Sequence, residues 1–175
     1  MSDIDPVETT NLDIYDNAAL DWSRARTQIV SQTGPDVTYF LCTTRPDGRP
    51  HVAGVGALWF EGDLFVVSGD QTRKSKNLQA NPACAFGVRL PGIDVTLEGS
   101  ARRVTDLQLL ERLAAHYRQN GWPAQVDAQT LAFTAAYSAP SAGPPPWQVY
   151  RFVFVSATGV ATAEPYGATR WRFNR

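Results

Sequence analysis

The sequence contains few residues of several types, and each shortage argues against a class of protein. Of 175 residues only two are cysteines, Cys42 and Cys84, and only two are histidines, His51 and His116. The cysteines lie far apart, each in an apolar run, which indicates buried thiols of a reducing compartment rather than a disulfide framework. No Cys, Asp or Glu cluster stands at ligand spacing around the histidines, so we expect no protein-built metal site.

The chain also lacks an excess of charge and any long hydrophobic segment. Its 16 Lys and Arg residues nearly balance 17 Asp and Glu residues, for a formal net charge of -1. No overall field would therefore attract a polynucleotide. No window of about 18 uninterrupted apolar residues occurs, and the opening segment lacks the basic start and apolar middle of a secretion signal. We expect a cytoplasmic protein without nucleic-acid or membrane partners.

The patterning that is present predicts one mostly β domain. Residues 1–15 are polar and expected to be flexible, and residues 16–175 are long enough for a single core. Helical patterns cover residues 17–30, 107–120 and, in a shorter piece, 123–133. Strand patterns cover residues 37–43, 52–60, 64–68, 84–90, 93–104, 147–155 and 169–173. Short strands joined by closely spaced turns favour an antiparallel barrel over a parallel sheet.

The segment that follows the strand pattern at residues 64–68 has the composition of an anion site. It predicts a short helix whose start carries free backbone N–H groups and the positive end of the helix dipole. Hydroxyls come from Thr72 and Ser75, and positive charges from Arg73 and Lys74. Asn77 shares a helical face with both cations. This mixture predicts a phosphate site, while a merely solvated basic face is the alternative.

Several motifs in one order resemble the split-barrel flavin and deazaflavin oxidoreductases, relatives of pyridoxamine 5'-phosphate oxidase. They are the turn Pro46-Asp47-Gly48-Arg49-Pro50, the strand from His51 to Trp59, the strand from Leu64 to Ser68, and the basic helix Thr72-Arg73-Lys74-Ser75-Lys76-Asn77-Leu78. Residues 168–173 are also similar to the C-terminal strand of the deazaflavin-using branch. The resemblance implies a six-stranded antiparallel split barrel with flanking helices. It also implies a flavin-type cofactor, either FMN or the deazaflavin coenzyme F-420.

The same resemblance implies a set of cofactor-binding residues. The phosphate would be bound by Arg73, Lys74 and Asn77, with hydroxyls from Ser68 and Thr72. The ring would be flanked by Val55, Gly56 and Ala57, where a planar tricycle must lie close to the strand backbone. For Gly56, a bulge or a packing need is the alternative.

Members of this family are homodimers with the cofactor in a cleft between subunits. The resemblance therefore implies a homodimer in which Arg170 and Trp171 complete the partner's site. An ordinary core or interface aromatic is the alternative for Trp171.

The function implied is an oxidoreductase in which the cofactor passes hydride to a small organic substrate. We expect no catalytic side chain, because the sequence has no Ser-His-Asp order and no conspicuous carboxylate pair. The ending Arg172-Phe173-Asn174-Arg175 does not show the tail with which pyridoxamine-phosphate oxidases hold their substrate, so vitamin B6 oxidation is not expected. The alternatives are a flavin- or haem-binding barrel without turnover and a structural dimer with an empty cleft.

Overall fold

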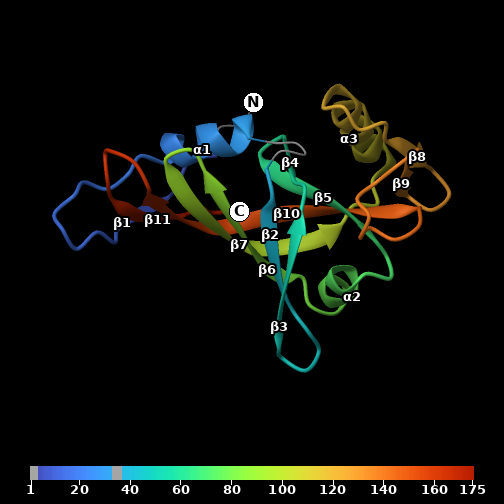
Figure 1. Cartoon of the computed structure of the whole chain (residues 1–175), viewed down its shortest axis with the longest axis horizontal. Coiled ribbons are helices and arrows are strands. Elements are labelled where there is room, and N and C mark those ends of the chain that lie inside the picture. Colours follow the sequence, from blue (N-terminus) through green and yellow to red (C-terminus); the bar gives the residue numbers. More distant parts are fainter. Residues whose placement is uncertain (1–3, 33–36) are drawn as a thin grey trace.

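The computed structural model describes residues 4–32 and 37–175, which form eleven strands and three helices (Figure 1). The helices are α1 (Trp22–Ser31), α2 (Arg73–Ala80) and α3 (Leu107–Gln119). The strands are β1 (Glu8–Asn11), β2 (Tyr39–Thr44), β3 (Pro50–Val55), β4 (Leu58–Phe60), β5 (Asp63–Gly69), β6 (Ala83–Leu90), β7 (Ile93–Arg103), β8 (Gln125–Asp127), β9 (Ala132–Thr134), β10 (Trp147–Ala161) and β11 (Ala168–Arg172). No helix among these described residues is both long and apolar enough to span a membrane.

The long strand β10 organises the sheet. Along one edge it pairs with β7. Its other edge is shared, because residues 147–152 pair with β5 and residues 156–160 pair with β11. The main path runs β1-β11-β10-β7-β6-β2-β3, and the pairs along it are antiparallel. In Figure 1, β1 and β11 lie at the left end of the molecule and α2 lies at the lower right, beside the β2–β3 hairpin.

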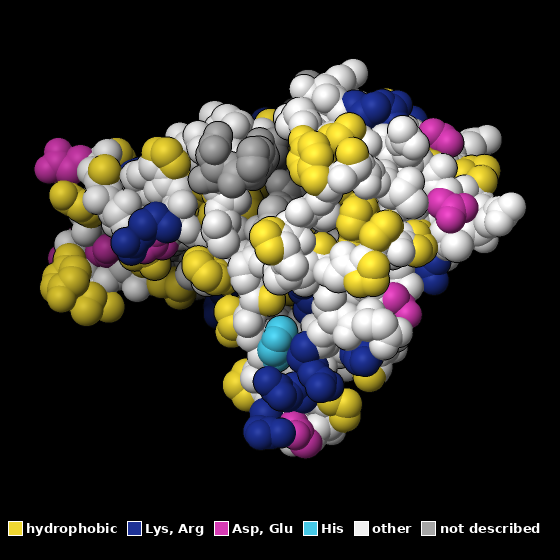
Figure 2. Space-filling view, turned by 45° about the vertical axis from the view of Figure 1, so that its right-hand side comes forward, with side chains coloured by type: hydrophobic (Ala, Val, Ile, Leu, Met, Phe, Trp, Pro, Cys, Tyr) yellow, Lys and Arg dark blue, Asp and Glu magenta, His cyan; other side chains and the backbone are white. Residues whose placement is uncertain are grey.

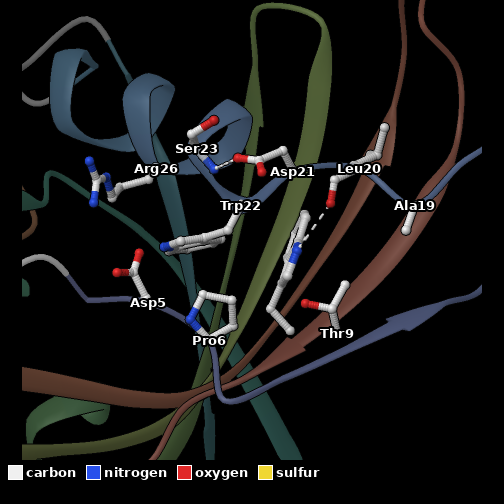
Figure 3. Close-up of a pocket in the computed structure, with 10 residues that line it drawn as sticks. Asp5, Pro6, Thr9, Ala19, Leu20, Asp21, Trp22, Ser23 and Arg26 are labelled. Carbon is white, nitrogen blue, oxygen red and sulfur yellow. Dashed lines mark hydrogen bonds between the residues drawn. The ribbon is translucent and has the colours of Figure 1, made fainter.

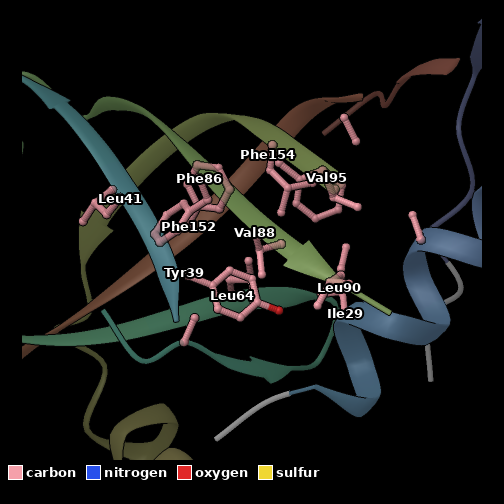
Figure 4. Close-up of a cluster of buried hydrophobic side chains, with 14 of the residues drawn as sticks. Ile29, Tyr39, Leu41, Leu64, Phe86, Val88, Leu90, Val95, Phe152 and Phe154 are labelled. Carbon is pink, nitrogen blue, oxygen red and sulfur yellow. The ribbon is translucent and has the colours of Figure 1, made fainter. Parts of the chain in front are cut away.

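Alternating side chains build the core inside this curved sheet. In β7, Ile93, Val95 and Leu97 are buried, whereas the residues between them are partly or fully exposed, as the sequence pattern predicts. Aromatic rings fill the centre (Figure 4), where the ring centroids of Phe86 and Phe152 lie 4.6 Å apart. Each such side chain contributes about 1.5–3 kcal/mol by leaving water. The core therefore fixes the strands that carry the candidate site.

The fold confirms the mostly β, antiparallel class and corrects several details. Eleven described strands exceed the six expected, since strands of three or four residues are too short to leave a pattern. The strand expected over residues 52–60 is interrupted between β3 and β4. Within the segment expected to be flexible, Glu8–Asn11 forms β1 and pairs with β11. These backbone hydrogen bonds outweigh the polar composition of the segment.

The short helix expected over residues 123–133 is wrong. That segment forms the β8–β9 hairpin, and β9 continues the sheet by pairing Phe133 with Trp147 of β10. The carboxylate of Asp127 accepts hydrogen bonds from the backbone of Gln129 and Thr130, which makes a turn instead of a helix. Leu131 then adopts a left-handed φ of 49°. Tertiary pairing with β10 thus overrides the helix propensity of the segment.

Candidate functional site

Helix α2 begins where β5 ends and packs against the β2–β3 hairpin. Thr72 caps its start by accepting a hydrogen bond from the backbone N–H of Ser75 at 3.4 Å. Leu78 is buried in the core, and Lys76 is exposed, as the helical spacing predicts. On the side facing the hairpin, the Asn77 amide donates to the hydroxyl of Thr43 at 2.9 Å. The helix is therefore held at both its start and its middle.

Three hydroxyls form a closed cluster under the helix start. The oxygens of Ser68 and Thr72 lie 2.8 Å apart, Ser75 donates to Ser68 at 2.9 Å, and Thr72 lies 3.1 Å from Ser75. Ser68 and Ser75 are buried. In this arrangement the hydroxyls satisfy one another and hold α2 on β5. A direct contact of Ser68 or Thr72 with phosphate stays a prediction.

The two cations at the start of α2 are placed against the usual preference for helices. Arg73 and Lys74 occupy the first turn, which contains no acidic residue, although the positive end of the helix dipole disfavours cations. Neither side chain makes a hydrogen bond or ion pair with any residue that the structure describes. Lys74 is only 9% exposed, and loss of hydration lowers its pKa. An anion bound here would offset both costs.

The hairpin adds three residues that the sequence analysis did not assign to this site. Thr43 and His51 are cross-strand partners in β2 and β3, and the Thr43 hydroxyl lies 3.4 Å from Nδ1 of His51. Arg45 follows in the connecting turn. Burial, and then the charges of Arg45, Lys74 and Arg73, lower the pKa of His51. Figure 2 shows one His within a group of Lys and Arg side chains at the lower end of the molecule.

The amide of Asn77 leaves an acceptor unused. Its side chain is completely buried, and Oδ1 has no hydrogen-bond partner among the described residues. Buried polar atoms without partners are rare because each costs about 1–3 kcal/mol. A ligand hydroxyl or N–H would satisfy this oxygen. The chain of hydroxyls between the ring and the phosphate of a flavin nucleotide offers such a donor, so the site fits this group.

The residues expected to flank the ring lie at the end of β3 and just beyond it. Val55 ends the strand, and its side chain shares a face with His51, about 13 Å away at the rise of an extended strand. Gly56 is exposed, and a Cβ added there would meet no atom within 4 Å. Ala57 is buried. One strand therefore leads from the cationic end of the site to an open stretch of backbone suited to a flat ring.

Arg170 and Trp171 lie far from α2 within one chain. On β10, Gln148 pairs with Ser68 beside α2, whereas Thr158, ten residues on, pairs with Arg170, a separation of about 33 Å along the strand. The structure thus does not bring these two residues to the cationic site of the same chain. Arg170 is half-buried, and its Nε has no hydrogen-bond partner in the described part of the chain.

Trp171 is completely buried in the core. Its indole donates a 3.2 Å hydrogen bond to the carbonyl of Leu20 and packs against Trp22, with ring centroids 5.3 Å apart. This packing is the ordinary core role that the sequence analysis kept as the alternative for Trp171. A contact with a cofactor stays a prediction.

Two hollows of similar size differ in their relation to α2. One, of about 430 Å³, lies between the N-terminal segment and α1 (Figure 3). Asp5 and Asp21 line it, and the carboxylate of Asp21 caps α1 through the backbone N–H of Ser23. Arg26 lines it as well, so its lining carries charges of both signs. The other, of about 380 Å³, lies between residues 69–72, which precede α2 and include Asp70, and the proline-rich loop at residues 141–146.

Comparison with known proteins agrees with this architecture. The family model described as pyridoxamine 5'-phosphate oxidase matches residues 34–161. The chain therefore belongs to the pyridoxamine 5'-phosphate oxidase family. A search of curated proteins found no match.

Several solved structures share the fold at low sequence identity. The haem-binding protein of Mycobacterium smegmatis is 18% identical with a TM-score of 0.59, covering 86% of this chain and 58% of that one. PhzG of Burkholderia lata 383, in complex with tetrahydrophenazine-1-carboxylic acid, is 16% identical with a TM-score of 0.56, covering 88% and 84%. General stress protein 26 of Bacillus anthracis str. Sterne is 15% identical with a TM-score of 0.52, covering 79% and 92%. These likenesses establish the fold alone.

Proposed function

We propose that this protein is an oxidoreductase that binds FMN or the deazaflavin coenzyme F-420 and promotes hydride transfer to a small organic substrate. The observation that carries the proposal is the pair of cations in the first turn of α2. Arg73 and Lys74 stand at the positive end of the helix without an acidic partner among the described residues, and Lys74 is buried. Stability alone would disfavour this arrangement, so we infer that it serves a phosphate.

In this proposal the cofactor supplies the hydride chemistry, and the chain supplies binding and orientation. Arg73 and Lys74 hold the phosphate by charge-assisted hydrogen bonds, and Asn77 accepts from the hydroxylated arm of the cofactor. The backbone beside Gly56 receives the flat ring. The ring's open face is left for the substrate. No protein nucleophile is required.

The double variant Arg73→Ala/Lys74→Ala tests the proposal. Each charge-assisted contact contributes about 1.5–3 kcal/mol, so losing both should weaken cofactor binding by at least about tenfold. Fluorescence titration with FMN and with the deazaflavin coenzyme measures the effect. Lys76→Ala is the matched control, since this exposed lysine lies on the same helix. If the folded double variant binds both cofactors as tightly as the unaltered protein, the phosphate assignment is wrong.

A binding protein without turnover is the second candidate. The Mycobacterium smegmatis structure of this fold is described as a haem-binding protein, and the cavities of the fold do not by themselves require catalysis. The visible spectrum of the purified protein separates the two candidates. Flavin bands, or quenching on titration with deazaflavin, support our proposal. A Soret band in this spectrum would support haem binding instead, with His51 or His116 as the axial ligand of the haem iron.

We also propose that the protein is a cytoplasmic homodimer with the cofactor cleft between subunits. The outer face of β2 and β3 exposes 50% of Phe40 and 55% of Val52, and we take these neighbouring apolar side chains as part of the subunit interface, because contiguous exposed apolar patches are typical of interaction surfaces. In this proposal the second copy supplies the Arg170 that one chain does not bring to α2. The free thiols of Cys42 and Cys84 support a reducing compartment.

A further inference from the structure

The position of His51 relative to α2 is fixed by a short chain of polar contacts. Asn77 donates to the Thr43 hydroxyl at 2.9 Å, and the same hydroxyl lies 3.4 Å from Nδ1 of His51. Thr43 and Asn77 are buried, whereas His51 is half-buried. The imidazole is therefore held at the boundary between the hairpin and the cationic start of the helix.

This contact can serve both protonation states of the imidazole. Neutral His51 accepts a hydrogen bond at Nδ1 from the Thr43 hydroxyl. Protonated His51 instead donates from Nδ1 to that oxygen, and the hydroxyl can turn to the His51 carbonyl oxygen, 3.5 Å away. Gaining a proton therefore breaks no buried hydrogen bond. The remaining ring nitrogen, Nε2, carries an N–H in both states and is free to donate to a ligand.

Among the described residues, the charges that act on the pKa of His51 are all positive. They are Arg45 in the β2–β3 turn and Arg73 and Lys74 on α2, while Thr43 on β2 and Asn77 on α2 are neutral. Burial and these cations lower the pKa of His51. The imidazole is therefore mostly neutral near pH 7 when the site holds no anion.

We propose that His51 is a further ligand of the anion and binds it in protonated form, so that binding of a phosphate-bearing ligand takes up one proton from solvent. The inference rests on the proposed function, because it concerns the same site. A dianion placed between Arg45, Arg73 and Lys74 cancels their repulsion of a charged imidazole. Protonated His51 thus adds a positive charge to the site only while the ligand is bound.

The sign of the pH dependence follows from this coupling. The bound anion raises the pKa of His51 above its value in the free protein. Affinity is lowest above the bound pKa and highest below the free pKa, and it tightens as pH falls between the two. A rise of one pKa unit corresponds to about tenfold in affinity.

Sulfate is the first probe, because it remains a dianion between about pH 5 and 8, whereas a phosphate monoester titrates near pH 6. The protein has two histidines, so two imidazole C2–H proton NMR signals are expected, and His51→Gln and His116→Gln assign them. His116 is the matched control, since its ring packs on Phe60 away from α2. We expect saturating sulfate to raise the pKa of His51 and leave that of His116 unchanged. Sulfate affinity should tighten about tenfold from pH 8 to pH 5.5 in the unaltered protein and in His116→Gln.

The His51→Gln variant decides the outcome. Gln keeps a side chain that can bond to Thr43 but carries no charge, so its sulfate affinity should lose most of this pH dependence. If sulfate and either cofactor bind and the pH dependence is the same in His51→Gln, the inference is wrong while the proposed function stands. If sulfate, FMN and the deazaflavin coenzyme all fail to bind the unaltered protein, or if those that bind it bind Arg73→Ala/Lys74→Ala equally well, the proposed function and this inference both fail.

Discussion

Replacing Lys74 with methionine should make the protein more stable and its cofactor binding weaker. Lys74 is 9% exposed and unpaired among the described residues at the positive end of α2. Methionine has a similar length and suits a buried position. Removing the cation relieves an unfavourable dipole interaction of about 0.3–1 kcal/mol, and removing a buried charge acts in the same direction. For a total of about 1 kcal/mol, Tm should rise by roughly 2–4 °C.

The same substitution removes one charge-assisted contact with the cofactor phosphate. At about 1.5–3 kcal/mol, its loss raises Kd by roughly 10- to 150-fold. Thermal unfolding without cofactor and fluorescence titration with cofactor measure the two effects separately. Lys76→Met is the control, because Lys76 is exposed on the same helix and its change should alter stability by less than about 0.5 kcal/mol.

The pH dependence of stability gives a further check on Lys74→Met. Burial lowers the pKa of Lys74 in the folded protein below the usual 10.5. Between the folded and unfolded pKa values the unfolded chain binds more protons, so the stability of the unaltered protein rises with pH there. The methionine variant lacks this rise, so the difference in free energy of unfolding between the two proteins should narrow as pH increases. A variant that is less stable than the unaltered protein at neutral pH, or that binds cofactor equally well, would refute the reasoning.

Two further substitutions test the supports of the site. In Gly69→Ala, the new Cβ would lie 2.1 Å from the carbonyl oxygen of Ala142, so the proline-rich loop must move. We expect a lower Tm and weaker cofactor binding. An unchanged Tm would contradict the close packing. In Arg175→Ala, the buried Asp63 loses a 2.6 Å ion pair and keeps its ion pair with Arg151. We expect the free energy of unfolding in urea to fall by about 1–3 kcal/mol, with cofactor affinity unchanged. Equal stability would show that the ion pair with Arg151 alone suffices.

The elements of the fold that sequence patterns predict are those with a clear period or a distinct boundary. The alternation in β7 and the capped helix α3 are of this kind, and Asp106 accepts hydrogen bonds from two backbone N–H groups as its position before the helix suggests. The hairpin at β8 and β9 is not, because its strands are three residues long and gain their stability from pairing with β10. The local propensity of a segment does not predict its pairing with a distant strand.

The residues of the candidate site also differ in whether the sequence alone places them together. Arg73, Lys74 and Asn77 are close in sequence, so helical spacing alone places them together. The meeting of Thr43, His51 and Asn77 depends on the register of β2 with β3 and on how α2 packs against that hairpin. The turn at residues 45–50 predicts a hairpin but not the contact with a helix. The role of His51 therefore becomes visible only in three dimensions.

The separation of Arg170 from α2 leads to a test of the proposed dimer. If each site takes its phosphate ligands from one subunit and Arg170 from the other, then Arg170→Ala and Arg73→Ala/Lys74→Ala should each bind cofactor poorly. A mixture of the two variants, unfolded and refolded together, should recover binding. Each mixed dimer contains one site with both sets of residues intact, so random pairing restores about a quarter of all sites. Titration of the mixture against each parent variant measures this fraction. Normal binding by Arg170→Ala would show that this residue is not a ligand, and a mixture without recovery would show that Arg170 does not complete the site of the partner subunit.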